Sequence, residues 1–252
     1  MRFLVQVLFA IVAASCLAAE APGIAGASRP STGVDEPAAT LRALEVPGFQ
    51  PALLFSPAGS KARPLVVAAH GAGGSAEWEC EYWRRLTYER AFVLCLQGTP
   101  LGGSYSGYFY RDHRALNREF MAAERAARAA DARILAGSGV YAGFSQGATM
   151  GTPILAEHAA AFPYAVLIEG FTSWNVPGGR KFVRAGGRRV LLACGSKECA
   201  AVAKTSERWL RAAEAQVRSE YAPGAGHTPA GPVMELVASA LPWLLADDPN
   251  WR

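Results

Sequence analysis

The sequence predicts a single α/β domain with a mostly parallel central sheet and helices on both of its faces. Short apolar segments alternate along the chain with longer segments of helical periodicity, which is typical of this architecture. Several of the short segments are almost entirely apolar, as expected of strands that are buried on both faces of a sheet. With 51% hydrophobic and 18% charged residues, the composition is that of a packed globular protein. No internal repeat and no linker to a second domain interrupts the pattern.

The predicted elements follow one another along most of the chain. The predicted strands are residues 50–55, 64–69, 91–96, 139–144, 165–169, 189–194 and 217–221. The predicted helices are residues 77–88, 113–130, 148–161, 200–216 and 232–245. Ligands bind to such sheets beyond the C-terminal ends of the strands. Nearly all the Gly-rich sequence falls there, in the turn around Ser145 and in residues 70–75, 97–111, 170–179, 195–199 and 223–229. We therefore expect the functional site at this edge of the sheet.

The first 19 residues are similar to a secretory signal peptide. Arg2 precedes an apolar run over residues 3–14, and small residues follow. The run is too short to span a bilayer and no later segment is long enough, so we predict export to the periplasm or the extracellular space without an integral membrane span. Cys16 has the place of a lipoprotein's acylated cysteine, but the expected leucine upstream is missing, which favours simple cleavage over a lipid anchor. Residues 20–40 are predicted to be a flexible leader and residues 41–252 the folded domain.

The remaining cysteines are Cys80, Cys95, Cys194 and Cys199. An even number in an exported protein predicts disulfides, and the simplest pairing is local, Cys80 with Cys95 and Cys194 with Cys199. The alternative is four buried thiols, because Cys95 and Cys194 have apolar neighbours. The cysteine spacings do not suit zinc, so we expect no metal site. The net charge of +4 comes from scattered arginines without a basic stripe, which argues against nucleic-acid binding.

The segment Gly143-Phe144-Ser145-Gln146-Gly147 follows an apolar run and precedes a helical one. This order predicts a strand, a sharp turn and a helix, with Ser145 at the apex. Such a turn strains the backbone of the serine, so small residues must stand two positions before and after it. Because this short pattern also occurs by chance, its meaning depends on the rest of the chain.

Two further segments supply what a nucleophilic serine needs. His70-Gly71-Ala72-Gly73-Gly74 follows a predicted strand, and its glycines allow backbone amides to face a bound oxyanion. We expect the amides of Ala72 and Gln146 to be the two donors. The loop lacks the glycine spacing and the lysine of a nucleotide-binding loop. His227 follows the last predicted strand, as expected of a general base.

Together, the loop at 70–74, the elbow at Ser145 and the late His227 resemble the α/β-hydrolase superfamily. The G-F-S-Q-G form is most similar to the carboxylesterase, phospholipase and acyl-protein thioesterase branch, and secreted depolymerase-like and feruloyl-esterase-like enzymes are near alternatives. The resemblance covers about residues 50–245. It implies hydrolysis of an ester, thioester or amide through an acyl-serine intermediate, with no metal and no organic cofactor.

In the superfamily, an acid completes a catalytic triad with the serine and the histidine, and this acid is usually an aspartate before the histidine. The chain departs from this pattern, because no aspartate lies between Ser145 and His227. Of the glutamates in that interval, only Glu169 and Glu198 stand at C-terminal strand ends. Glu198 occupies the superfamily's usual acid position, although it also fits a polar loop that faces solvent. Glu169 ends an apolar strand, one strand earlier, where a buried carboxylate needs a partner. Because Glu198 stands at the usual acid position, we slightly favour it over Glu169 as the acid of the triad.

Three aromatic residues are candidates for the substrate wall. Tyr108 and Tyr110 lie in a tyrosine-rich segment after a predicted strand, and Trp174 lies in another loop of the same edge. Aromatic side chains near an active site often contact an acyl or aryl group. The alternative is that these rings pack in the core.

The sequence therefore predicts an exported serine hydrolase that acts on a small-molecule acyl ester. One alternative is a secreted serine peptidase, although no separate domain is present to select peptides. A second alternative is a hydrolase-like binding protein without activity, which only the missing aspartate supports.

Overall fold

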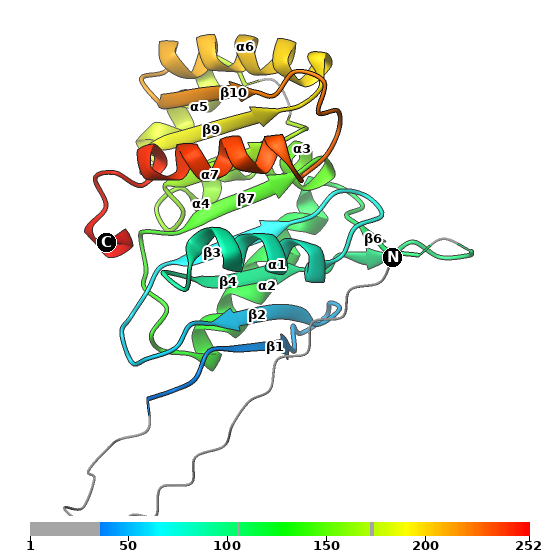
Figure 1. The fold of residues 1–252 in the computed structure, drawn as a ribbon, viewed down its shortest axis with the longest axis vertical. Helices are drawn as coiled ribbons and strands as arrows, with labels where there is room; N and C mark the ends of the chain where they lie inside the picture. The colour runs from blue at the N-terminus through cyan, green and yellow to red at the C-terminus, as the bar shows by residue number, and fades with distance from the viewer. Residues whose placement is uncertain (1–35, 105, 172–173) are drawn as a thin grey trace, which may run out of the picture. The chain divides into compact units, whose positions relative to one another are not determined.

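The computed structural model describes residues 36–104, 106–171 and 174–252. Its centre is an eight-stranded sheet (Figure 1). Taken across the sheet, the strands are β1 (Thr40–Leu44), β2 (Ala52–Ser56), β4 (Phe92–Leu96), β3 (Leu65–Ala69), β7 (Val140–Phe144), β8 (Tyr164–Ile168), β9 (Arg189–Cys194) and β10 (Gln216–Tyr221). A separate ribbon pairs β5 (Thr99–Pro100) with β6 (Tyr108–Phe109).

The sheet is mostly parallel, as the sequence predicts. Strand β2 runs antiparallel to both β1 and β4, whereas all other neighbours are parallel. Strands β3, β4, β8 and β9 are buried along their whole length, which explains why their sequences are apolar except for Arg189 at the start of β9. The strand order reverses between β3 and β7, so the loops that follow these two strands leave the sheet at a topological switch point.

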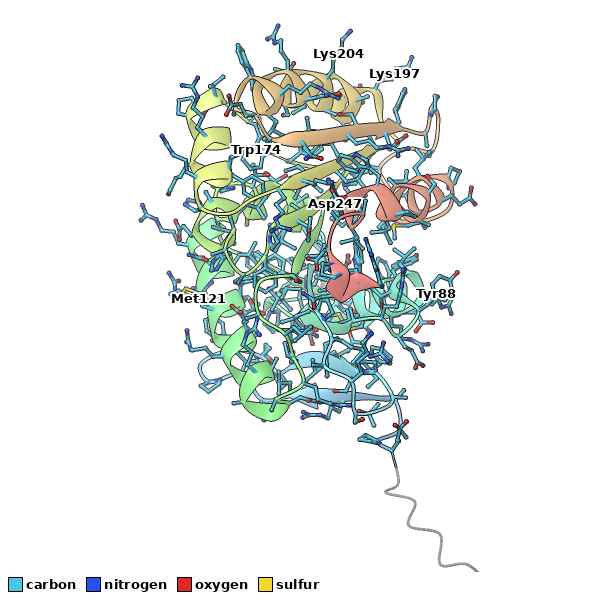
Figure 2. The ribbon with its side chains drawn as sticks, turned by 90° about the vertical axis from the view of Figure 1, so that its left-hand side faces the viewer. Tyr88, Met121, Trp174, Lys197, Lys204 and Asp247 are labelled. Carbon is cyan, nitrogen blue, oxygen red and sulfur yellow. A yellow bond between two sulfur atoms is a disulfide. The ribbon has the colours of Figure 1, made fainter. Side chains whose placement is uncertain are left out.

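Helices cover both faces of the sheet. One face carries α1 (Ala76–Thr87) and α7 (Pro232–Leu244), and a short 3₁₀ helix, η1 (Pro249–Trp251), packs with them. The other face carries α2 (His113–Ala130), α3 (Gln146–Gly151), α4 (Leu155–His158), α5 (Val176–Arg184) and α6 (Lys197–Ala212). Figure 2 shows the two layers, with Met121 of α2 and Tyr88 at the end of α1 on opposite sides of the molecule.

Alternation along the strands divides the core in two. In β3, Val67 packs into the cluster beneath α2, whereas Val66 and Ala68 pack into the cluster beneath α1 and α7. This alternation follows from the two-residue period of a strand. The two layers hold the strand ends of β3, β7, β8 and β9 in fixed positions, and the candidate site is built on these ends.

Four parts of the fold differ from the sequence prediction. The helix predicted over residues 148–161 is broken into α3 and α4, because Pro153 lacks the amide that a continuous helix needs. Helix α5 lies where a loop was expected, although Asn175 caps it by accepting a hydrogen bond from Gly178 N. Strand β1 and the β5–β6 ribbon were also not predicted.

The cysteines form the two local disulfides that the spacing favours, Cys80–Cys95 and Cys194–Cys199. Both are compatible with an exported protein. The predicted signal peptide over residues 1–19 and the candidate lipid anchor at Cys16 lie outside the described residues, as does most of the predicted leader, whose last residue begins β1. None of the helices in the described ranges has the length and hydrophobicity to cross a membrane.

Candidate active site

Ser145 stands at a sharp turn between β7 and α3. Its backbone has φ 48° and ψ −108°, a region that non-glycine residues rarely adopt. A Cβ at Gly143 would lie 2.7 Å from Ala148 Cα, and one at Gly147 would collide with the carbonyl oxygen of Ala69. Glycine is therefore required on both sides of Ser145, as the sequence pattern predicts.

The loop after β3 packs directly against this turn. Gly147 N donates a hydrogen bond of 3.0 Å to His70 O, and a Cβ at Gly71 would lie 3.0 Å from Ser145 Cβ. A hydrogen bond of 2.8 Å from Gly73 N to Tyr108 O fixes the outer part of the loop to β6. The loop and the turn thus meet at the switch point between β3 and β7.

The amides expected to form an oxyanion hole are free to do so. Among the described residues, the backbone N–H groups of Ala72 and Gln146 have no hydrogen-bond partner. Ala72 is exposed and Gln146 is half-buried, so a ligand can reach this part of the site. His70, beneath the loop, is buried, with Nδ1 2.7 Å from Gly71 O and Nε2 2.9 Å from Gln97 O. Burial lowers the pKa of His70, and these two backbone contacts offset part of that effect.

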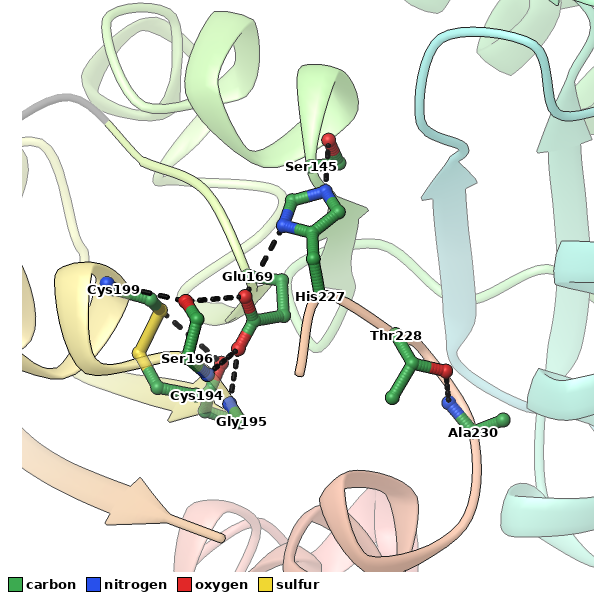
Figure 3. A network of polar contacts seen from close by, with 10 residues as sticks. Ser145, Glu169, Cys194, Gly195, Ser196, Cys199, His227, Thr228 and Ala230 are labelled. Carbon is green, nitrogen blue, oxygen red and sulfur yellow. Dashed lines mark hydrogen bonds and ion pairs between the residues drawn. A yellow bond between two sulfur atoms is a disulfide. The ribbon is translucent and has the colours of Figure 1, made fainter. Parts of the chain in front are cut away.

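His227 lies between Ser145 and Glu169 (Figure 3). Its Nε2 is 2.8 Å from Ser145 Oγ, and its Nδ1 is 3.2 Å from Glu169 Oε2. The ring also packs on Phe144, with 5.2 Å between the ring centroids. The His227 side chain is 55% exposed, whereas the Glu169 side chain is completely buried. A solvent-accessible imidazole thus connects a buried carboxylate with a serine hydroxyl.

Glu169 follows β8 and is the only glutamate that the described structure places against His227. Its own backbone has a positive φ of 53°, which turns the side chain toward β9. The carboxylate accepts hydrogen bonds from Gly195 N, from Ser196 N at 2.9 Å and from Ser196 Oγ at 2.9 Å. These donors give the buried carboxylate the partners that its position requires.

The narrow preference for Glu198 is corrected by this geometry. Glu198 lies in the first turn of α6 with an exposed side chain. Helix α6 begins at Lys197, directly after the Gly195 and Ser196 amides that bind Glu169. The loop after β9 therefore presents two backbone amides and the Ser196 hydroxyl to the site, and not its glutamate.

The three aromatic candidates have different surroundings. Tyr110 is buried at 2% exposure and donates its hydroxyl hydrogen to Leu96 O, so its ring belongs to the core and not to a substrate wall. Its backbone N–H donates to Gln146 Oε1 at 2.7 Å, which ties the segment before α2 to the serine turn. Trp174 is also buried, with its ring packed on Phe182.

Only Tyr108 remains half-exposed near the loop after β3. Trp174 lines a cavity of about 180 Å³ with residues of α4, of α5 and of the segments that precede these two helices, and neither Ser145 nor His227 contributes to that cavity. The expected contacts of Tyr110 and Trp174 with a substrate are thus corrected by their burial in the core.

One group of side chains within the described part of the chain has the spacing of metal ligands, namely Glu169, Cys194 and Cys199. Both sulfurs are joined in a disulfide, so neither is a thiolate that could bind a metal ion. Sequence reasoning missed Ser196, although a serine directly before a helix is a typical N-cap.

No protein-family model and no curated protein matches the chain, but its fold matches many solved structures. A carboxylesterase from Bacillus cereus is 20% identical, with a TM-score of 0.55 over 75% of this chain and 91% of that one. A dienelactone hydrolase from Anabaena variabilis is 17% identical, with a TM-score of 0.57 over 83% and 97% of the two chains. A dienelactone hydrolase-like promiscuous phosphotriesterase from metagenomic libraries is 16% identical, with a TM-score of 0.62 over 84% and 99%. The chain has the α/β-hydrolase fold.

Proposed function

We propose that this protein is a serine hydrolase that cleaves carboxylic esters through an acyl-serine intermediate. The observation that carries the proposal is the hydrogen-bonded chain from Ser145 Oγ through His227 to the Glu169 carboxylate. A serine hydroxyl is a weak nucleophile until an adjacent base removes its proton, and an oriented imidazole is the usual base. The strained turn at Ser145 and the free amides beside it support the same assignment.

The hydrogen-bond partners support one direction of proton transfer. A carboxylate only accepts hydrogen bonds, so the Nδ1 of His227 carries the hydrogen that faces Glu169. The Nε2 atom is then unprotonated and accepts the hydrogen of the Ser145 hydroxyl. In this tautomer, Ser145 Oγ can attack the carbonyl carbon of an ester while its proton passes to His227 Nε2.

The remaining steps use the same groups. The oxyanion of the tetrahedral intermediate would accept hydrogen bonds from the amides of Ala72 and Gln146. Return of the proton from His227 to the leaving oxygen releases the alcohol and leaves an ester of Ser145. Water then attacks this ester and gives a proton to His227. As the second intermediate collapses and releases the acid, His227 passes that proton to Ser145 Oγ and so restores the serine hydroxyl. Esters are proposed as the substrate class because a carboxylesterase and a dienelactone hydrolase are among the structural neighbours.

Covalent labelling tests the proposal most directly. A fluorophosphonate probe should label the wild-type protein on Ser145, and p-nitrophenyl acetate should be hydrolysed. The Ser145→Ala variant should lose labelling and at least about 10³-fold in kcat. Ser60→Ala, at an exposed serine away from the site, should retain both.

Two results would contradict the proposal. One is the absence of labelling in wild-type protein that is folded by circular dichroism. The other is equal ester turnover by wild type and Ser145→Ala. A parallel panel of p-nitrophenyl esters and peptide anilides separates ester from peptide hydrolysis, and the proposal expects the esters to be turned over faster.

A further inference from the structure

The Cys194–Cys199 disulfide closes a small ring at the C-terminal end of β9. The ring contains Gly195 and Ser196, and it leads into the first turn of α6. Gly195 N and Ser196 N both donate to Glu169 Oε1, while Ser196 Oγ donates to Glu169 Oε2 (Figure 3). Among the described residues, every donor that holds this carboxylate, apart from His227, therefore comes from the ring.

The Ser196 hydroxyl has a defined orientation. Cys199 N lies 3.3 Å from Ser196 Oγ and donates to it, which makes Ser196 the N-cap of α6. A hydroxyl has one hydrogen to donate, and the carboxylate 2.9 Å away can only accept. The hydroxyl hydrogen is thus directed at Glu169 Oε2. The cap that orients this hydroxyl lies within the ring that the disulfide closes.

The two carboxylate oxygens are held differently. In the described part of the chain, two backbone amides hold Oε1, whereas the partners of Oε2 are the Ser196 hydroxyl and His227. Oε2 is the oxygen that faces the imidazole, at 3.2 Å from Nδ1. Its position toward His227 therefore depends on Ser196.

The ring also contacts the loop that carries His227. Gly226 N donates a hydrogen bond of 3.1 Å to Gly195 O. A Cβ at Gly195 would collide with Gly226 O and would lie 2.9 Å from Val233 Cγ2. Gly195 is thus packed between the glutamate and the histidine loop, and the ring fixes both partners of the Glu169–His227 pair.

We infer that Ser196, held in the ring that the Cys194–Cys199 disulfide closes, is a positioning residue that aligns Glu169 with His227 for catalysis. The inference rests on the proposed function of Ser145. Ser196 acts through Glu169 and contacts no reacting atom. Loss of its hydroxyl leaves the nucleophile, the base and the acid in place but frees Oε2 to rotate away from Nδ1.

The test compares Ser196→Ala with Ser196→Thr on p-nitrophenyl acetate. Removing one hydrogen bond to a charged group should lower kcat of Ser196→Ala about 10-fold with KM unchanged. Ser196→Thr keeps a hydroxyl and should recover kcat to within about threefold of wild type. Asp112→Ala is the matched control, because Asp112 caps α2 by accepting from Ala115 N and is exposed. It should lose stability like Ser196→Ala but retain kcat.

The disulfide supplies a second measurement that does not depend on how Ser196→Ala folds. The double variant Cys194→Ala/Cys199→Ala should also lower kcat, and adding Ser196→Ala to it should change kcat by less than about twofold, because both changes release the same carboxylate. Cys80→Ala/Cys95→Ala, which removes the other disulfide, should leave kcat unchanged.

The outcomes separate this inference from the proposed function. If Ser196→Ala keeps wild-type kcat, or if Asp112→Ala loses as much, the positioning role is wrong even though Ser145→Ala is inactive. If the two cysteine-pair variants affect kcat equally, the ring has no special role. If Ser145→Ala itself retains turnover, the proposed function has failed and the inference fails with it.

Discussion

Glu169 and His227 are 58 residues apart in the sequence, yet their Oε2 and Nδ1 atoms lie 3.2 Å apart. The carboxylate is completely buried and the imidazole is more than half exposed. A buried carboxylate is thus joined to an imidazole that is open to solvent, and under the proposed function this imidazole has room to act as the base between Ser145 and a leaving group. The contact also supports a proposed acid in the loop after β8, one strand before the position that the resemblance favoured.

The two glutamates give the first prediction. Glu169→Gln keeps the size of the side chain, but its amide can place an N–H opposite Nδ1 and so stabilise the wrong tautomer of His227. We expect kcat for p-nitrophenyl acetate to fall by about 10³-fold with little change in KM. Glu198→Gln, the matched control at an exposed position, should stay within about twofold of wild type. Equal rates for the two variants would refute the assignment of the acid.

A second prediction concerns the close packing behind Ser145. Gly147→Ala would drive a Cβ into the carbonyl oxygen of Ala69, which belongs to a fully buried strand and cannot move freely. We expect the free energy of unfolding to fall by about 3 kcal/mol, measured by urea denaturation. Gly178→Ala is the control, since its Cβ would meet no backbone atom and only the Asn175 side chain, whose Oδ1 lies 3.1 Å away. A Gly147→Ala variant as stable as Gly178→Ala would show that the turn tolerates a side chain.

The fold could be predicted from the sequence because its signals are local and repeated. Seven predicted segments of strand length, most of them largely apolar, lie where seven of the eight sheet strands are found. Strand β1 could not be predicted, because it lies at the edge of the sheet and is mostly exposed, so that its sequence lacks a continuous apolar run. Helix α5 could not be predicted, because Gly178 and Gly179 weaken its helical sequence pattern, although Asn175 is a typical N-cap residue.

The site could be predicted only in part. The arrangement of Ser145, His227 and the loop after β3 follows from chain order and from the rule that parallel strands end at one edge. The choice between Glu169 and Glu198 could not be made, because it depends on a positive φ at residue 169 and on donors from another strand. The burial of Tyr110 likewise depends on pairing between segments distant in sequence.

The third prediction separates stability from catalysis. Cys80 and Cys95 are completely buried and join α1 to β4 across a sequence separation of 15 residues. Removing a disulfide of this loop length should lower the free energy of unfolding by about 3 kcal/mol. Urea denaturation of Cys80→Ala/Cys95→Ala against wild type measures the loss, with kcat as the internal control. An unchanged midpoint would mean that the bridge adds nothing to a core that is already packed.

The fourth prediction concerns Glu79 of α1, which is buried at 5% exposure and accepts a hydrogen bond of 3.2 Å from Trp83 Nε1. Burial raises the pKa of Glu79 from 4.5 to about 8. Between these values the folded state keeps a proton that the unfolded state releases, so stability should fall as pH rises, by at most about 1.4 kcal/mol per unit. Glu79→Gln stays neutral and should flatten this slope in urea denaturations between pH 5 and 8. A variant with the wild-type slope would show that Glu79 does not cause it.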